Sequence, residues 1–322
     1  MSPWTWIGLI LCNLVWAVNP TIVKRLIQEV GPEHTAFLKY AVGLVAYMVI
    51  LGGLRLFPRK KSHRITPLWM PLLPKKDFLT VVAIGIATCF LSPLTQVIGL
   101  QVSSAANNCI LVTFEPLFAV LFGWLFFRER MNQSHYGSFL LATLGFLFIS
   151  KVLDFDSFDF KTNLIKFEVG DLILLVGVAC EALYSVLARH LTRNYAGSTI
   201  FGTAMLVGVI LLALVIFPWK GLPPLHHLST QGWITAIWFG VFGTAIPYLY
   251  WLYALSKSHS IGSVVLSLFL QPLIGTAVAV AFLGEKLGPQ HLIGGSLILG
   301  GVLFQILAEN RKDLPRDAIT LP

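Results

Sequence analysis

The sequence has little charge and few cysteines. Only 12% of its 322 residues are charged, whereas a soluble domain averages about 25%. Its four cysteines lie in apolar runs without metal-ligand spacing, so we expect small buried side chains and no metal site. A Walker phosphate loop and an HExxH pair are also absent from the sequence. The chain therefore lacks the motifs of ATP hydrolysis and of zinc proteases, and we expect no enzyme and no cofactor.

Apolar residues are abundant instead and make up 56% of the chain. A bilayer core is crossed by about 20 apolar residues, and its backbone must satisfy its own hydrogen bonds, so long apolar runs predict helices. Ten such segments can be marked, at 4–25, 35–54, 78–99, 103–127, 132–151, 169–191, 198–218, 231–256, 260–284 and 289–308. The predicted fold class is an all-α membrane protein with ten transmembrane helices.

The basic residues predict the orientation in the membrane. The net charge is +8, and the basic side chains lie mainly in short loops, where they serve topology rather than nucleic-acid binding. With the N-terminus inside, the inner loops hold 15 Lys and Arg and the outer loops 7, with Lys39 within a helix. Both termini are therefore predicted to be cytoplasmic, and the basic, proline-rich loop 55–77 is predicted to contact anionic lipid.

An internal repeat divides the chain. A shift of 156 residues places SSAANNCILVTFEPLFAVLFGWLFFRERM (103–131) on HSIGSVVLSLFLQPLIGTAVAVAFLGEKL (259–287) without a gap. Five helices in each repeat is an odd number, so the second copy enters from the opposite side and the two repeats are inverted, around a central site. The predicted domains are a first repeat at 1–151, a linker at 152–168, a second repeat at 169–308 and a cytoplasmic tail at 309–322.

These repeats, together with VWAVNPTIVKRL (15–26) and GDLILLVGVACEALYSVLARHL (170–191), resemble the EamA-type transporters of the drug/metabolite transporter superfamily. The resemblance implies ten helices around a central cavity, lined mainly by the first, third, fourth, sixth, eighth and ninth helices. It also implies transport of small metabolites, often exported amino acids. Two departures stand out: arginines flank Glu129 where Gly-Glu-Arg is frequent, and Glu181 stands where an aromatic residue is frequent.

Polar residues interrupt two symmetry-related apolar segments. Glu115 and Gln271 lie near the centres of 103–127 and 260–284, and each precedes a proline. A polar residue beside a broken helix in both repeats indicates a transport site, and an ionisable residue inside the membrane is functional by default. Gln271 is equally compatible with a bond between helices. The prolines predicted to kink helices are Pro20, Pro93, Pro116, Pro247 and Pro272.

Further charged residues leave alternatives open. Glu181 lies near the middle of 169–191, so the two central acids have no base at the same depth and at least one should be protonated. We take Glu115 and Glu181 as candidates for proton coupling, with a structural hydrogen bond as the alternative for Glu181. Lys39 either extends to the outer interface or attracts a substrate carboxylate or a midplane acid. Glu129 and Glu285, at helix ends, are predicted to form structural caps or loop salt bridges.

The predicted function is a secondary transporter that exports a small polar or amphipathic metabolite, amino acid-like or drug-like, across the cytoplasmic membrane by alternating access coupled to protons. We expect it to act as a monomer or homodimer. An uncoupled facilitator is one alternative and a membrane-embedded enzyme is another. The predicted substrate-binding residues, which share polar or aromatic character on cavity-facing helices, are Trp16, Asn19, Lys39, Asn107, Glu115, Glu181, Tyr184, Tyr248 and Gln271.

Overall fold

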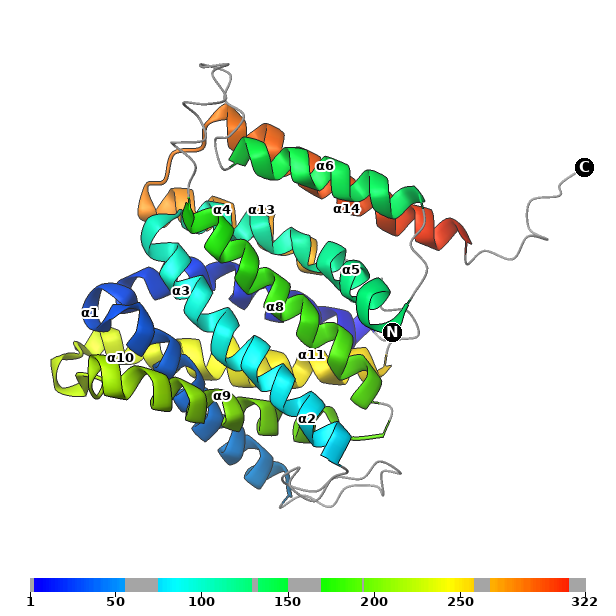
Figure 1. Cartoon of the computed structure of the whole chain (residues 1–322). Coiled ribbons are helices and arrows are strands. Elements are labelled where there is room, and N and C mark those ends of the chain that lie inside the picture. The colour runs from blue at the N-terminus through cyan, green and yellow to red at the C-terminus, as the bar shows by residue number, and fades with distance from the viewer. Residues whose placement is uncertain are drawn as a thin grey trace, which may run out of the picture.

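The computed structural model describes residues 3–55, 75–128, 133–149, 169–192, 194–257 and 267–312. Every extended regular element in these ranges is a helix (Figure 1). Most of the basic loop, the predicted linker and the end of the predicted tail lie outside the described residues. The same holds for Glu129.

Helix α1 (Pro3–Arg55) contains a break that the sequence placed in a loop. Its apolar part, Trp4–Gly53, has 50 residues, more than twice the length that crosses a bilayer. Gly31 alone leaves helical geometry, with φ 79° and ψ 165°, a conformation that glycine adopts without steric cost. Pro32 follows it and has no backbone N–H to continue the ladder. The expected loop between 25 and 35 is thus helical on both sides of one glycine.

The remaining helices follow in two groups. The first half of the chain continues with α2 (Lys75–Ile84), η2 (Gly85–Leu91), α3 (Ser92–Val102), α4 (Ala105–Leu111), η3 (Val112–Phe114), α5 (Glu115–Phe127) and α6 (Gln133–Ile149). The second half contains α8 (Val169–Leu191), α9 (Gly197–Lys220), η4 (Leu225–His227), α10 (Thr230–Ile237), η5 (Trp238–Ala245), α11 (Ile246–Lys257), η6 (Ser267–Phe269), α13 (Leu270–Leu283) and α14 (Pro289–Lys312). Among the described residues, six helices are long and apolar enough to span a membrane and three shorter ones are also apolar. The count of ten spans stays a prediction.

Four of the five prolines predicted to kink helices follow a stretch of altered helix. The π-helical η2 and η5 end just before Ser92-Pro93 and Ile246-Pro247. The 3-10 turns η3 and η6 precede Glu115-Pro116 and the start of α13, which contains Pro272. Since proline lacks an N–H and crowds the preceding turn, the ladder adjusts there. Pro20, in contrast, lies inside α1 without an interruption of helical geometry.

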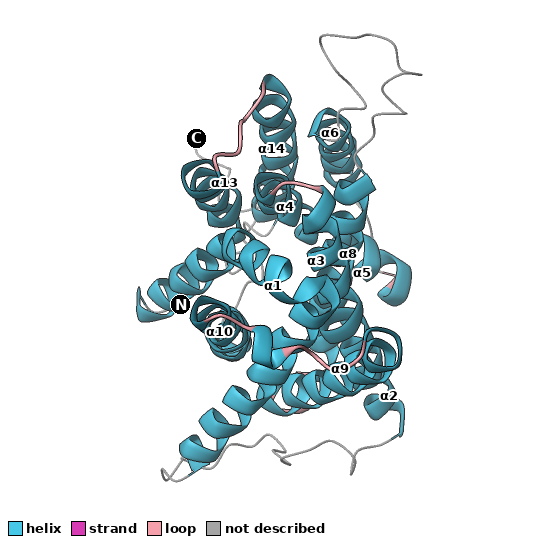
Figure 2. Cartoon of the chain, turned by 90° about the vertical axis from the view of Figure 1, so that its left-hand side faces the viewer, coloured by secondary structure: helices cyan, strands magenta, loops and turns pink. Residues whose placement is uncertain are grey.

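The helices form two bundles, and each bundle mixes the two halves of the chain (Figure 2). The first bundle packs α1 against α10, η5, α11 and α13. The second bundle packs α8 against α2, η2, α3, α4 and α5, with α9 on η2. The bundles meet where α4 packs on α13 and where α1 packs on α3 and α9. Residues from both halves of the sequence can therefore face one space between the bundles.

Helices α6 and α14 pack side by side, set apart from the two bundles (Figure 1). Their backbones approach closely at glycines, which have no Cβ. A Cβ added to Gly145 would lie 2.5 Å from the Gly294 carbonyl oxygen, and one added to Gly301 would lie 3.0 Å from the Ser138 carbonyl oxygen. The early part of α6 thus meets the late part of α14, so the pair is antiparallel. Under the shift of 156 residues Gly145 corresponds to Gly301 and Ser138 to Gly294, so each of these two contacts is the repeat equivalent of the other.

Candidate functional site

A cavity lies between the two bundles and contains about 950 Å³ of empty space, including its open mouth. Residues from α1, α3, α4, α5, α8, η5, α11 and α13 contribute to its wall, so both halves of the chain build it. Its polar and aromatic lining residues are Trp16, Asn19, Lys39, Gln96, Asn108, Cys109, Glu115, Glu181, Tyr184, Ser185, Phe239, Tyr248, Trp251 and Gln271.

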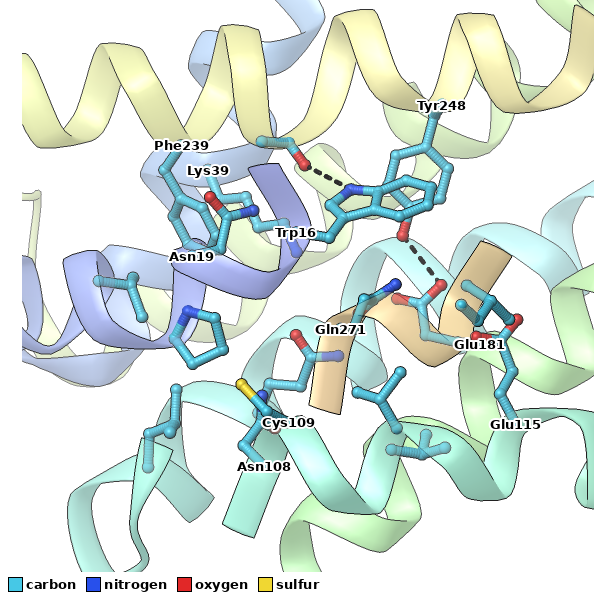
Figure 3. Close-up of a pocket in the computed structure, with 18 of the residues that line it drawn as sticks. Trp16, Asn19, Lys39, Asn108, Cys109, Glu115, Glu181, Phe239, Tyr248 and Gln271 are labelled. Atoms are coloured by element: carbon cyan, nitrogen blue, oxygen red, sulfur yellow. Dashed lines mark hydrogen bonds between the residues drawn. The ribbon is translucent and has the colours of Figure 1, made fainter. Parts of the chain in front are cut away.

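Two carboxylates lie together on one side of this cavity (Figure 3). Glu181, in the middle of α8, accepts hydrogen bonds from Ser92 Oγ at 2.7 Å and from the Tyr248 hydroxyl at 2.9 Å. Glu115, the first residue of α5, accepts one hydrogen bond from Ser185 Oγ at 3.2 Å. Both acids face the same cavity in an apolar surrounding, where two negative charges require a proton or a cation nearby.

Lys39 contributes the positive charge of the cavity wall. Its side chain is only 5% exposed, so the prediction that it extends to the outer interface is wrong. Its Nζ atom lies 4.9 Å from the ring centre of Phe239 and 5.2 Å from that of Tyr40, within the range of cation–π attraction. With the residues that the structure describes, it forms neither a hydrogen bond nor an ion pair closer than 4 Å. Its ammonium group is therefore available to a negatively charged ligand.

Gln271 forms the bond between helices that the sequence considered, and it also lines the cavity; its part in transport stays a prediction. Its Nε2 donates to Asn13 Oδ1 at 2.8 Å, which joins α13 to α1. Asn13 in turn donates to Ser267 Oγ and to the Leu9 carbonyl oxygen, each at 2.8 Å. The side chain of Gln271 also lines the cavity, so the bond between helices fixes the orientation of an amide in the cavity wall.

An aromatic cluster separates the cationic and acidic parts of the cavity (Figure 3). Trp16 makes edge contacts with Tyr248 at 5.4 Å and with Trp251 at 5.5 Å between ring centres. Its Nε1 donates to the carbonyl oxygen of Gly243, in the wide π turn η5, at 3.1 Å. This bond holds the indole in place, because a π turn leaves backbone carbonyls free for outside donors.

Eight of the nine predicted binding residues lie in the cavity wall, and their role in binding stays a prediction. Asn107 is the exception, because its Nδ2 donates to both carboxylate oxygens of the buried Asp171 at 3.0 Å. Its neighbour Asn108 lines the cavity instead. Sequence reasoning missed Gln96, although a glutamine inside the apolar run 78–99 was a usable signal. It also missed Cys109 and Phe239, for which an apolar run offers no signal.

The burial predicted for the cysteines is largely confirmed. Cys12, Cys89 and Cys109 are buried and Cys180 is partly buried, and all four are free thiols. Within the described ranges, no three His, Cys, Asp or Glu side chains come together as a metal would require.

Comparisons with known proteins agree with this architecture. The family model described as "EamA-like transporter family" matches residues 3–151 and again residues 168–307. The "Uncharacterized transporter YdfC" of Bacillus subtilis is 24% identical over 93% of this chain and 90% of its own length. The "Probable terminal-alkyne amino-acid exporter" of Streptantibioticus cattleyicolor is 25% identical over 66% of each chain. A solved structure with 18% identity superimposes with a TM-score of 0.62 and covers 97% of this chain, which shows that the fold is shared.

Proposed function

The chain belongs to the EamA-like transporter family of integral membrane proteins, and from this premise we propose that it transports a small zwitterionic metabolite, such as an amino acid, out of the cell. The distribution of charge in the cavity carries this proposal. Lys39 lies on one side of Trp16, and Glu115 and Glu181 lie on the other (Figure 3). A zwitterion presents one charge to each side, and its apolar part contacts the aromatic rings between them. The amino-acid exporter among the relatives supports the same substrate class.

We propose that the protein lies in the cytoplasmic membrane with ten membrane spans in two inverted repeats. Both termini are proposed to be in the cytoplasm. Three observations support this topology. Gly31 divides α1 into two segments of spanning length. The family model matches the chain twice. Helices α6 and α14 correspond to each other under the shift of 156 residues, and they pack antiparallel. This is expected for two copies related by an axis in the membrane plane.

We further propose that Glu115 carries the proton that drives transport, with Glu181 as the second candidate. Glu181 accepts two hydrogen bonds, from Ser92 and Tyr248, so its charge is stabilised locally. Within the described part of the chain, Glu115 accepts one hydrogen bond, from Ser185. An acid with less compensation exchanges its proton for the ammonium group of a substrate more readily. An uncoupled facilitator would lack this exchange.

The test is a counterflow assay with purified protein in liposomes. The vesicles are loaded with one of the twenty amino acids, and the uptake of a labelled trace of the same compound is measured. We expect uptake of at least one zwitterion and a loss of about tenfold or more in Lys39→Gln, since an uncompensated substrate carboxylate is costly to bury. The proposal is wrong if no amino acid is exchanged, or if Lys39→Gln leaves the exchange unchanged. Chemical conversion of the solute would point to the enzyme alternative.

A further inference from the structure

Glu285, in the short loop between α13 and α14, holds together three parts of the chain. The sequence predicted a cap or a loop salt bridge here, and the structure confirms both. One carboxylate oxygen accepts from Lys24 Nζ and from the Ala105 backbone N–H, each at 2.9 Å, and the other accepts from the Ala106 N–H at 3.0 Å. Lys24 belongs to α1, and the two amides begin α4.

The N-terminus of α4 is fully hydrogen-bonded only because of this carboxylate. The N–H groups of Asn107 and Asn108 bond to Ser104, through its side chain at 2.8 Å and its carbonyl oxygen at 3.2 Å. Those of Ala105 and Ala106 have Glu285 instead. A negative charge also suits the positive end of a helix. Burial alone would raise the pKa of Glu285, but the two backbone N–H groups and Lys24 together lower it below its usual value.

These bonds cross from one bundle to the other at one end of the cavity. Lys24 and the loop after α13 belong to the first bundle, whereas α4 belongs to the second. Val23, next to Lys24, lines the cavity, and so does Cys109, about one helical turn beyond Ala105. The contact between Glu285 and α4 therefore lies just past the last lining residues at this end.

Helices of the two bundles also pack directly on one another. Helix α1 packs against α3, which joins the two bundles. The repeat relates the part of α1 before Gly31 to α8, the part after it to α9, and α3 to α11. Among the described residues α9 packs on α11, whereas α8 and α11 show little backbone packing. Glu181 of α8 meets Tyr248 of α11 through side chains instead.

We propose that Glu285 is a latch that keeps the cavity closed at the Lys24 end, and that its bonds to the α4 amides break when this end opens. The inference rests on the alternating access proposed above. The side chains of Glu285 and Lys24 are 15% and 24% exposed, so water can replace the partners on release. The latch is therefore reversible, unlike a fully buried ion pair.

Cys109 provides a native reporter for the test, because this buried thiol lies in the cavity wall near the latch. Full-length protein in sealed vesicles of known orientation is exposed to a membrane-impermeant maleimide on one side. Mass spectrometry of the Cys109 peptide then measures the labelling rate. Glu285→Ala should raise labelling from the Lys24 side about tenfold, the effect of losing charge-assisted hydrogen bonds worth about 1.4 kcal/mol. Glu285→Gln and Lys24→Gln, which keep part of the contact, should raise it less.

Glu29→Gln is the matched control. Glu29 lies five residues beyond Lys24 on the same helix and accepts two hydrogen bonds from Ser229, at 2.8 and 3.0 Å, but both residues belong to the first bundle. This variant should label like wild type. Unchanged labelling in Glu285→Ala, or an equal increase from both sides, would overturn the latch. If Glu285→Ala fails to accumulate, Lys24→Gln decides by the same criteria. No substrate is needed, so failure here leaves the proposed transport activity standing.

Discussion

Tyr248 and Glu181 form a hydrogen bond of 2.9 Å between the two bundles, with the tyrosine hydroxyl as donor. The ring of Tyr248 stacks on Phe201 of α9, with ring centres 4.4 Å apart and planes 12° apart. A residue of α11 thus binds to α8 and α9 of the opposite bundle. Any relative motion of the bundles must break or bend these contacts, so Tyr248 reports on the conformational cycle as well as on the acidic side of the cavity.

Tyr248→Phe removes the hydroxyl and keeps the ring stacked on Phe201. A hydrogen bond to a charged acceptor contributes about 1.5–3 kcal/mol, so we expect the free energy of unfolding to fall by that amount. Chemical denaturation in detergent measures it. Ser92→Ala, which removes the other donor to Glu181, is the matched variant and should cost a similar amount. If neither single variant lowers the free energy of unfolding, Glu181 is not held by these two bonds; a double variant that costs less than the sum shows that the two bonds are coupled.

Glu115→Gln tests proton coupling. The amide keeps the shape of the side chain but cannot titrate, and it makes the two repeats alike at this position, where the second has Gln271. We expect equilibrium exchange of substrate to continue and accumulation driven by a pH gradient to stop, as measured in proteoliposomes. Accumulation with the wild-type dependence on pH would contradict the carrier role and leave Glu181 as the next residue to test.

Gly275→Ala tests the close approach of α13 to the opposite bundle. The added Cβ would lie 2.3 Å from Cys109 Sγ and 2.7 Å from the Ala17 carbonyl oxygen, so backbones must shift. Such overpacking costs about 1–3 kcal/mol, seen as a lower melting temperature in detergent. Gly300→Ala on α14 is the control, because no atom lies within 4 Å of the added carbon. Equal behaviour of the two variants would show that the α4–α13 contact adjusts freely.

The lowered pKa of Glu285 predicts a pH dependence with a defined sign. A carboxyl group whose pKa is lower in the folded state stabilises the protein above the unfolded pKa of about 4.3, and this contribution is lost as the pH falls through the folded value. Melting temperatures of wild type and Glu285→Gln should therefore differ most at neutral pH and converge under acidic conditions. A difference that grew on acidification would contradict the assigned direction.

The proposed orientation is tested at both faces. A reporter that works only in the cytoplasm should be active when it is fused after Pro322, because the C-terminus is proposed to be cytoplasmic. A cysteine placed at Leu222, which is 74% exposed between α9 and α10, should react with an impermeant thiol reagent added outside the cell. Labelling of this cysteine only from the cytoplasmic side would reverse the orientation.

The sequence predicted the helical fold and most of the cavity wall because polar residues in apolar runs are costly and therefore informative. Glu115, Glu181 and Gln271 were identified on that basis, and all three line the cavity. The sequence could not predict that Lys39 lies in the cavity wall rather than at the membrane interface. The position of a residue along a helix does not tell which face of the helix its side chain occupies. Asn107 and Asn108 show the same limit, since adjacent helical residues point about 100° apart and only tertiary packing selects one.

The wide turns η2 and η5 have a consequence for how sequences of this family can be compared. A π turn holds one more residue than an α turn, so each of these helices contains the equivalent of a one-residue insertion. Deleting one residue from Gly85–Leu91 would restore an α turn and rotate the segments on either side by about 100° relative to each other. Ser92 would then point away from Glu181. Relatives without the insertion should show a one-residue gap before the equivalent proline, and their cavity should be lined by a different set of positions from that helix.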